Sequence, residues 1–241
     1  MEIKNFINNL FKQNNENMHD FSILNDKGNI PPNPQEMKTN IFPNIQQNLE
    51  FLKSKYNTLL NSDIIIREFN MSANNKEYKA FIIYIDGLAD SISINDFVLE
   101  PLMLRRKQNN SIFQNNLAEY VDYCLLPQTS VKKVTEFEKV LSSINSGNCL
   151  LFIDTLAIAF DIDVKNYKQR SINNPENETI IKGPQEGFIE NLRTNTSLLR
   201  RSVNNENLVI ENIPVGNISQ TKCGVCYIQN IANGDLIAEV K

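Results

Sequence analysis

Apolar residues recur at helical and then at strand spacing from about residue 43 onward. Within residues 45–59 they fall at intervals of three and four, which predicts an amphipathic helix capped by Asn44 (Ile45, Leu49, Leu52, Tyr56 and Leu59). Two β-rich runs follow at 63–69 and 79–86, and the polar stretch 71–78 separates them. The pattern therefore predicts the order helix–strand–strand.

Two more helices are predicted in the middle of the chain. The first begins at Ser93 or Asn95, and Pro101 is expected to break or kink it because proline lacks the backbone N–H. The second covers 117–126 and ends at Pro127.

The next elements are a capped helix and a pair of strands. Thr135 and Glu138 form a T-x-x-E capping box, and Gly147 is the predicted C-terminal cap of the helix between them. Residues 149–163 then read as two strands around a turn at Asp154–Thr155.

A further helix and strand pair follow the polar stretch 170–179. The helix is entered through Gly183–Pro184, since proline suits a first helical turn. Its apolar face is predicted to consist of Phe188, Leu192, Leu199 and Val203. Strands are expected at 208–213 and 222–228.

The chain contains an internal repeat. Residues 48–90 align without a gap on residues 191–233 at a constant shift of 143, and the two segments share the order helix–strand–strand. The identical pairs are Asn48/Asn191, Leu49/Leu192, Ser54/Ser197, Asn61/Asn204, Glu68/Glu211, Asn74/Asn217, Lys79/Lys222, Tyr84/Tyr227, Ile85/Ile228 and Ala89/Ala232.

These elements predict an α/β fold with mixed sheets (α+β), built from two related subdomains of which the second is truncated. Residues 1–42 are expected to form a disordered, Asn-rich tail, and 43–170 the first α/β subdomain. Residues 171–182 are expected to be a linker, and 183–241 a second, incomplete α/β subdomain.

Composition excludes several functional classes. The net charge is −4, and basic residues occur only in short clusters, so no nucleic-acid partner is expected. The N-terminus lacks the apolar segment of a secretory signal, and the longest apolar stretch, 149–160, is interrupted by Asp154. We therefore expect this chain to be soluble and cytosolic, with its cysteines reduced.

Few residues suggest catalysis or cofactor binding, so no enzyme activity, cofactor or metal is expected. A single histidine and eight glycines, with no G-x-G pair, leave no His-based triad and no phosphate-binding loop. Cys223 and Cys226 form a C-x-x-C, but they lie in a predicted strand, which favours buried structural cysteines over a redox pair. Asp86, Asp90 and Asp96 are interpreted as turn and helix-start residues more readily than as an acid–base or metal cluster.

The segment GPQEGFIENLRTNTSLLRR, residues 183–201, has more hydrogen-bonding groups than a surface helix needs. Glu186 and Glu190 lie near the predicted N-terminal end and Arg200 and Arg201 near the other, so both charges complement the helix dipole. Glu190 and Arg193 are spaced to form an ion pair. The alternatives are a solvated face and a docking surface.

This segment resembles the string GPREGFxENLRTNxxLLRR of the GerA family of spore germination proteins. IDGLADSISINDFVLEPLM at 85–103 and SGNCLLFID at 146–154 are also similar to the family, and the likeness covers residues 45–241. Gln185 departs from the family pattern, which has arginine there, and so does the C-x-x-C. The docking residues that the resemblance implies are Gly183, Pro184, Gln185, Glu186, Gly187, Glu190, Asn191, Arg193, Thr194, Asn195, Arg200 and Arg201.

The resemblance implies the N-terminal region of a germinant receptor A subunit on the cytoplasmic side of the spore inner membrane. It would assemble with a transporter-like B subunit and a lipoprotein C subunit, and it would relay a signal during nutrient-triggered germination. The family's membrane helices are not in this chain, which we expect to be a fragment or the product of an interrupted gene. Two hypotheses stay open beside this one: a small-molecule module that senses a nutrient between the subdomains, and a hydrolase with carboxylate chemistry, which the missing nucleophile and base disfavour. Self-association is also expected.

Overall fold

The computed structural model describes residues 39–73, 76–104, 116–128, 130–165 and 187–241. All of these residues fall in one compact unit that spans residues 38–241. We refer to residues 39–165 as the first subdomain and to residues 187–241 as the second. The predicted tail (up to residue 38) and the linker 171–182 lie outside the described residues.

The first subdomain is built on a hairpin of two long strands, β1 (Ile64–Ala73) and β2 (Lys76–Ile85). They pair antiparallel, with Ile64 opposite Ile85 and Met71 opposite Tyr78. Residues 71–73 and 76–78, which the sequence assigned to a polar loop, extend the strands instead. Met71 explains the difference, because its side chain is fully buried in the core and holds the strand in register.

Three more strands complete a five-stranded sheet in the order β1-β2-β4-β5-β3, and every pairing is antiparallel. β4 (Cys149–Ile153) and β5 (Ala159–Ile162) are buried along their whole length, as the apolar runs predict. β3 (Val131–Val134) was not predicted, because it is short and carries Lys132 and Lys133. Charged residues on such an edge strand prevent unwanted pairing with another chain.

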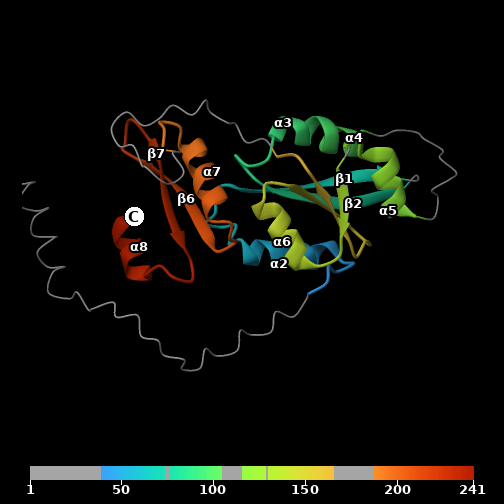
Figure 1. Ribbon diagram of the computed structural model, residues 1–241, viewed down its shortest axis with the longest axis horizontal. Coiled ribbons are helices and arrows are strands. Elements are labelled where there is room, and N and C mark those ends of the chain that lie inside the picture. Colours follow the sequence, from blue (N-terminus) through green and yellow to red (C-terminus); the bar gives the residue numbers. More distant parts are fainter. Residues whose placement is uncertain (1–38, 74–75, 105–115, 129, 166–186) are drawn as a thin grey trace, which may run out of the picture. The chain divides into compact units, whose positions relative to one another are not determined.

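Helices α2 (Ile45–Lys55) and α6 (Phe137–Asn145) cover one face of this sheet (Figure 1). Asn44 caps α2 as predicted, because its side chain accepts a hydrogen bond from the backbone N–H of Gln46. Leu59 is 97% exposed, since the helix ends at Lys55 and the predicted apolar face does not continue.

The predicted capping box of α6 is wrong. Its N-cap is Glu136, and no side chain caps it. The backbone of residues 39–41 takes that role: Phe137 N–H donates to Thr39 O and Ile41 N–H donates to Thr135 O. Residues 39–42 are therefore packed on the first subdomain and do not belong to a tail, and Ile41 is only 3% exposed. Gly147 ends the helix with a φ of +92°, as expected.

The opposite face is covered by a helical layer of α3 (Ser91–Ile94), the π-helical turn η1 (Asn95–Leu99) and α4 (Glu100–Met103), seen above the sheet in Figure 1. A second helix, α5 (Leu117–Tyr120), continues as another π-helical turn, η3 (Val121–Leu125). The layer starts at the N-cap Asp90, before the predicted Ser93 or Asn95. The missing N–H of Pro101 coincides with the wide turn of η1, so the chain changes helical pitch there without a break.

The second subdomain contains α7 (Leu192–Ser202), β6 (Leu208–Val215), β7 (Thr221–Ile228) and α8 (Gly234–Val240). β6 and β7 form an antiparallel pair. The sequence missed α8, and it placed the start of α7 too early. Residues 187–191 are not helical, and residues 183–186 lie outside the described part. Among the described helices, none is long and apolar enough to span a bilayer.

The predicted repeat is confirmed, but the gapless alignment is wrong at its helix. After β2 and β7 the shift is 143. Ala89 N–H donates to Ile85 O, and Ala232 N–H donates to Ile228 O in the same way. Asp90 and Asn233 are the N-caps of the helices that follow, α3 and α8. At the helices the shift is 147.

The hydrogen bonds at the helix starts fix this second shift. Asn44 and Asn191 are the N-caps of α2 and α7. Four residues later, Asn48 bonds the N–H and C=O of Phe42, and Asn195 bonds those of Ile189 in the same way. The shift changes because residues 56–63, between α2 and β1, form a longer loop than 203–207, between α7 and β6.

Candidate functional site

The end of the longer loop, residues 61–63, is where the first subdomain meets the second. Arg200 of α7 lies with its side chain only 2% exposed, and its Nε and Nη2 each donate to the Asp63 carboxylate at 2.8 Å. Nη2 also donates to Asn61 Oδ1 at 2.9 Å. This is the paired arrangement that a buried guanidinium requires.

The same loop follows the outer edge of β6. Ser62 N–H donates to Ile210 O at 2.9 Å, and Ile210 N–H donates to Asn61 Oδ1 at 2.8 Å. Asn212 N–H donates to Ser62 Oγ at 3.0 Å. The loop therefore occupies the position of a neighbouring strand, and it satisfies backbone groups that an open sheet edge would leave unpaired.

A second contact joins α7 to the turn after β2. Arg193 forms an ion pair with Asp86, and both side chains are partly exposed. Gly87 has a φ of +93°, and a Cβ built there would lie 3.3 Å from Ser197 Cβ. Glycine thus provides both the left-handed turn and the close approach of the helix. We call the two contacts together the junction.

Most polar side chains on α7 bond within their own segment. The Asn191 side chain accepts from Thr194 N–H, and Asn195 holds the loop at Ile189. Thr196 Oγ1 donates to the Arg193 carbonyl. The excess of polar groups is therefore accounted for largely by capping and by the junction.

The structure places the predicted docking residues in four groups. Asn191, Thr194 and Asn195 bond within their own segment at the start of α7. Gly183, Pro184, Gln185 and Glu186 lie outside the described residues. Gly187, Glu190 and Arg201 are exposed. Arg193 and Arg200 belong to the junction, where Arg193 pairs with Asp86 rather than with Glu190.

The predicted apolar face of α7 is wrong. Its buried residues are Thr196 and Arg200, whereas Phe188 precedes the helix and is 67% exposed. Sequence reasoning also missed the other half of the junction, residues 61–63. The available signal was Asn61, which is one of the repeat's identical pairs.

The junction also affects the pKa of a nearby thiol. Partial desolvation raises the pKa of the Cys226 thiol, and the charge of Asp63 raises it further, while Arg200 opposes the shift. Cys223 and Cys226 are both exposed on β7, so the expectation of buried cysteines is wrong. The reason is that neither face of β7 is closed by packing, since every residue of this strand is exposed or only partly buried.

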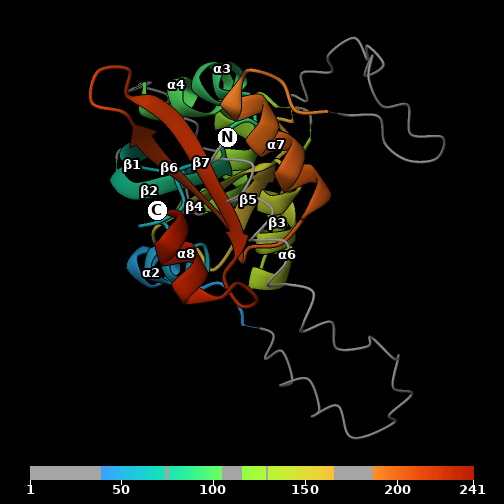
Figure 2. The ribbon, with the colours of Figure 1, turned by 90° about the vertical axis from the view of Figure 1, so that its left-hand side faces the viewer.

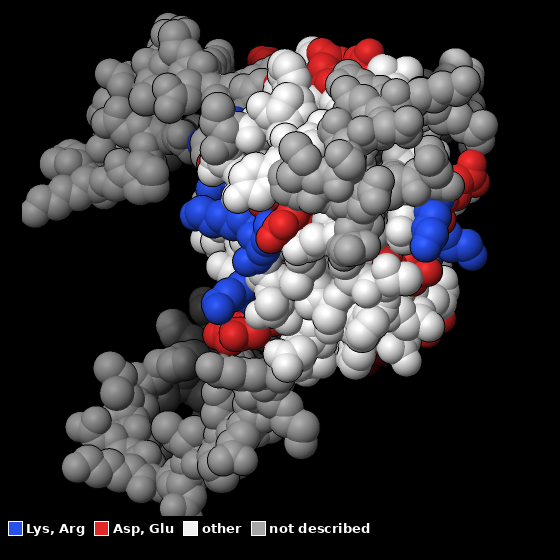
Figure 3. Space-filling model, turned by 90° about the vertical axis from the view of Figure 1, so that its right-hand side faces the viewer, with Lys and Arg blue, Asp and Glu red and all other residues white. Residues whose placement is uncertain are grey.

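Chemically, the junction is suited to holding two parts of a chain together. It is an Arg–Asp–Asn cluster held by three hydrogen bonds, without a nucleophile and base in hydrogen-bond reach of each other. Among the described residues no group of three or more His, Cys, Asp or Glu side chains could hold a metal ion. On the face shown in Figure 3, basic and acidic side chains adjoin each other and do not form a patch of one sign.

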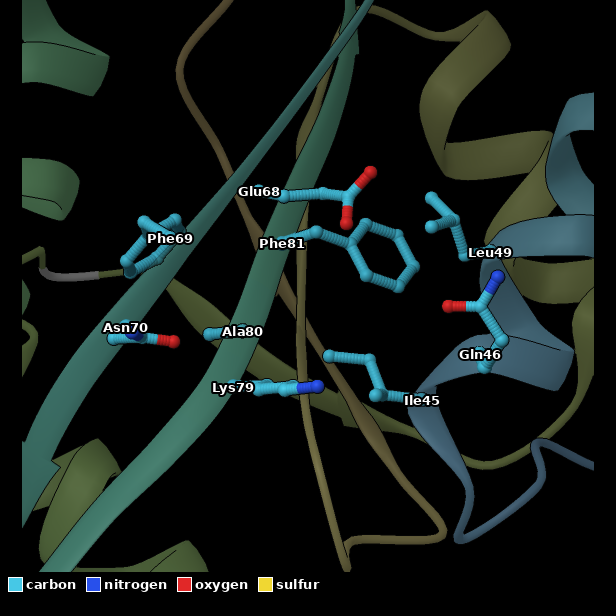
Figure 4. Close-up of a pocket in the computed structure, with 9 residues that line it drawn as sticks. All are labelled: Ile45, Gln46, Leu49, Glu68, Phe69, Asn70, Lys79, Ala80 and Phe81. Carbon is cyan, nitrogen blue, oxygen red and sulfur yellow. The ribbon is translucent and has the colours of Figure 1, made fainter.

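A separate cavity of about 320 Å³ lies within the first subdomain, between the start of α2 and the β1–β2 hairpin. Figure 4 shows the Glu68 carboxylate, the Lys79 ammonium and the Gln46 amide around the ring of Phe81, which lies between them. Glu68 also pairs with Lys53 at 3.6 Å. A pocket with two opposite charges fits a small zwitterion better than an apolar compound.

Comparison with known proteins gives consistent results. A family model described as Bacillus/Clostridium GerA spore germination protein matches residues 50–241. Spore germination protein KA of Bacillus subtilis is 32% identical over 83% of this chain, and spore germination protein B1 of the same species is 31% identical over 81%. The chain spans 36% and 39% of the length of these two relatives.

A solved structure is also similar. It is the crystal structure of the N-terminal domain of the A subunit of the Bacillus megaterium spore germinant receptor GerK3. The TM-score is 0.62 at 25% sequence identity, and the match covers 84% of this chain and 71% of that one.

Proposed function

Because the chain belongs to the GerA family of spore germination proteins, we propose that it is the N-terminal region of a germinant receptor A subunit. In this role it contributes to subunit assembly and relays a conformational change between its two subdomains during nutrient-triggered germination. The relatives' names and the likeness to the N-terminal domain of a receptor A subunit support the setting. On this proposal the chain works at the cytoplasmic side of the spore inner membrane, and it performs no catalytic step.

The observation that carries the relay is the junction. A movement of α7 must either break or carry along the Arg200–Asp63 pair, because both charges are buried and each is the other's counterion. The first subdomain therefore follows the second as one body, or the two separate at a high energetic cost. A buried, hydrogen-bonded link of this kind can carry a movement of α7 to the loop of residues 61–63.

The exposed residues of the 187–201 segment are available for other subunits. Gly187 and Glu190 are exposed, and Arg193 forms a partly exposed ion pair with Asp86. We assign to this segment the contact with a transporter-like B subunit or a lipoprotein C subunit.

Substitution of Arg193 in a full-length receptor subunit tests this role. Exposed ion pairs contribute at most about 1 kcal/mol, so Arg193→Ala should leave the isolated chain folded, as judged by circular dichroism. In spores, Arg193→Ala should lower the germination rate or the receptor level. Arg193→Lys, which keeps the positive charge, should lower the same quantity less. Normal germination and receptor level in the Arg193→Ala spores would contradict the assignment.

A second candidate function is nutrient binding. The sequence placed such a ligand between the subdomains, whereas the cavity with suitable chemistry lies inside the first one, at Glu68 and Lys79. Titration of free amino acids into the isotope-labelled chain, followed by NMR, tests it. Saturable shifts at Glu68 and Lys79 that Lys79→Ala abolishes would favour this function over a purely structural one.

A further inference from the structure

The outer edge of β7 has no neighbouring strand in the described part of the chain. β7 pairs only with β6 there, and the other edge of β6 is bonded to Asn61 and Ser62. Figure 2 shows β7 crossing the front of the view, between α7 and α8, with no described element covering it.

The corresponding edge in the first subdomain is paired. β2 occupies the place of β7 in the repeat, and β4 pairs with it antiparallel from Ala80 opposite Ile153 to Ile83 opposite Leu150. Residues 80–83 are at most 2% exposed, whereas at the matching positions Cys223, Gly224 and Cys226 are exposed.

The helix after the strand shows the same contrast. Ile94 of α3 is 1% exposed, and the equivalent Ile237 of α8 is only partly covered. Leu236 and Val240 on α8 are 58% and 63% exposed. Apolar area is thus open beside the unpaired strand, and such a surface marks an interaction site.

The sequence of β7 also lacks the devices that protect an edge. The edge strand β3 is four residues long and has two lysines, and the edge strand β1 carries Arg67 and Glu68. β7 has eight residues, with Lys222 as its one charge and without proline. Long edges of low charge pair readily with another strand.

We propose that β7 is a strand-addition site and that its occupant is β7 of a second copy of this chain. A two-fold axis normal to the sheet makes two identical strands antiparallel, which is the polarity that β4 has on β2. A pairing centred on Gly224 or Val225 places Lys222 opposite the partner's Cys226 or the partner's Ile228, so like charges do not meet. The product is a continuous sheet in which β6 is the outermost strand of each copy.

Sedimentation of the full chain over a range of concentrations, with a reducing agent present, tests the proposal. We expect a reversible monomer–dimer equilibrium, with amide exchange at Thr221–Ile228 slowing as the dimer fraction rises. Cys223→Lys places a charge at the centre of the edge and should weaken dimerisation at least about fivefold. Cys223→Val, which keeps an uncharged edge, should dimerise as the parent does.

A matched control is Asn70→Lys, which adds the same charge to the exposed edge strand β1 and should leave the equilibrium unchanged. Three results would overturn the proposal. The first is a monomer at every concentration, and the second is a dimer whose β7 amides exchange as fast as in the monomer. The third is a monomer in which those amides are already protected, since another segment of the same chain would then occupy the edge.

Discussion

At the scale of single residues, Arg200 and Asp63 form an ion pair in which each side chain neutralises the charge of the other. Both are buried, and the guanidinium makes two hydrogen bonds to the carboxylate and one to Asn61. Arg200 Nη1 is buried without a partner, so the site does not satisfy every donor of this guanidinium. Replacing one member leaves the other as an uncompensated charge, which is costly in a protein interior.

Arg200→Ala should therefore lower the free energy of unfolding by about 3–5 kcal/mol. Chemical denaturation followed by circular dichroism measures the loss. The control is Arg201→Ala, which removes the same charge from an exposed neighbour in the last turn of α7 and should cost less than about 1 kcal/mol.

The double variant Asp63→Ala/Arg200→Ala separates pairing from packing. Because it removes both charges, it should be more stable than the sum of the single losses predicts. Additive losses in this cycle would show that the two side chains are not coupled.

At the scale of elements, the β6–β7 pair has its own titrating group. Glu211 on β6 is 9% exposed, and it accepts hydrogen bonds from Tyr227 at 2.5 Å and from Lys241 at 2.8 Å. Burial raises the pKa of Glu211, but the hydrogen bonds from Lys241 and Tyr227 and the charge of Lys241 outweigh it, so its pKa is lowered. The folded state thus favours the ionised carboxylate.

The sign of the pH dependence follows from this shift. The stabilisation is fully present above the ordinary glutamate pKa of about 4.5, and it is lost as the pH falls through the lower pKa of the folded state. Lys241→Met removes the main cause of the lowering. The difference in unfolding free energy between parent and variant should therefore shrink between pH 6 and pH 3, and a constant difference would contradict the assignment.

At the scale of the whole molecule, the two subdomains differ in how much apolar surface they bury. Two clusters of buried residues fill both faces of the five-stranded sheet in the first subdomain. In the second, Leu208, Val209 and Ile210 are the buried apolar residues, and α8 has none. A unit with so small a core opens more easily.

Amide hydrogen exchange should therefore be faster in residues 206–241 than in residues 64–73, 76–104 and 130–160. In a dilute, monomeric sample the amides of Thr221–Ile228 should exchange well before those of Phe81–Ile85. Mass spectrometry of peptic fragments measures both segments in one experiment. Equal protection of the two strands would show that the second subdomain is as stable as the first.

Local patterns gave most of the elements correctly. The alternation and apolar runs of β1, β2, β4, β5, β6 and β7 predict these strands to within a few residues, because side chains on a half-buried or fully buried strand must match its period. The helix α2 and its cap Asn44 follow from the same kind of local rule. β3 and α8 were missed because they are short, and because neither carries a buried apolar pattern.

The repeat and the family likeness were also available from the sequence alone. Both depend on the order of residues along the chain, which the fold does not alter. The exact shift was not available, because a difference in loop length between α2–β1 and α7–β6 leaves the strands aligned and displaces the helices. Only the cap hydrogen bonds of Asn44 and Asn191 reveal it.

Which residues form the junction was determined only by the tertiary structure. From the sequence, Arg200 is interpreted as a solvated cation at a helix end, and Asp63 as the first residue of a predicted strand. In the structure each is the counterion that permits the other to be buried. They are 137 positions apart, and a charge can enter the interior only where its partner arrives from elsewhere in the fold. The sequence thus determined the elements and their repetition, whereas only the packing of α7 against residues 61–63 determined which polar residues became the core of the site.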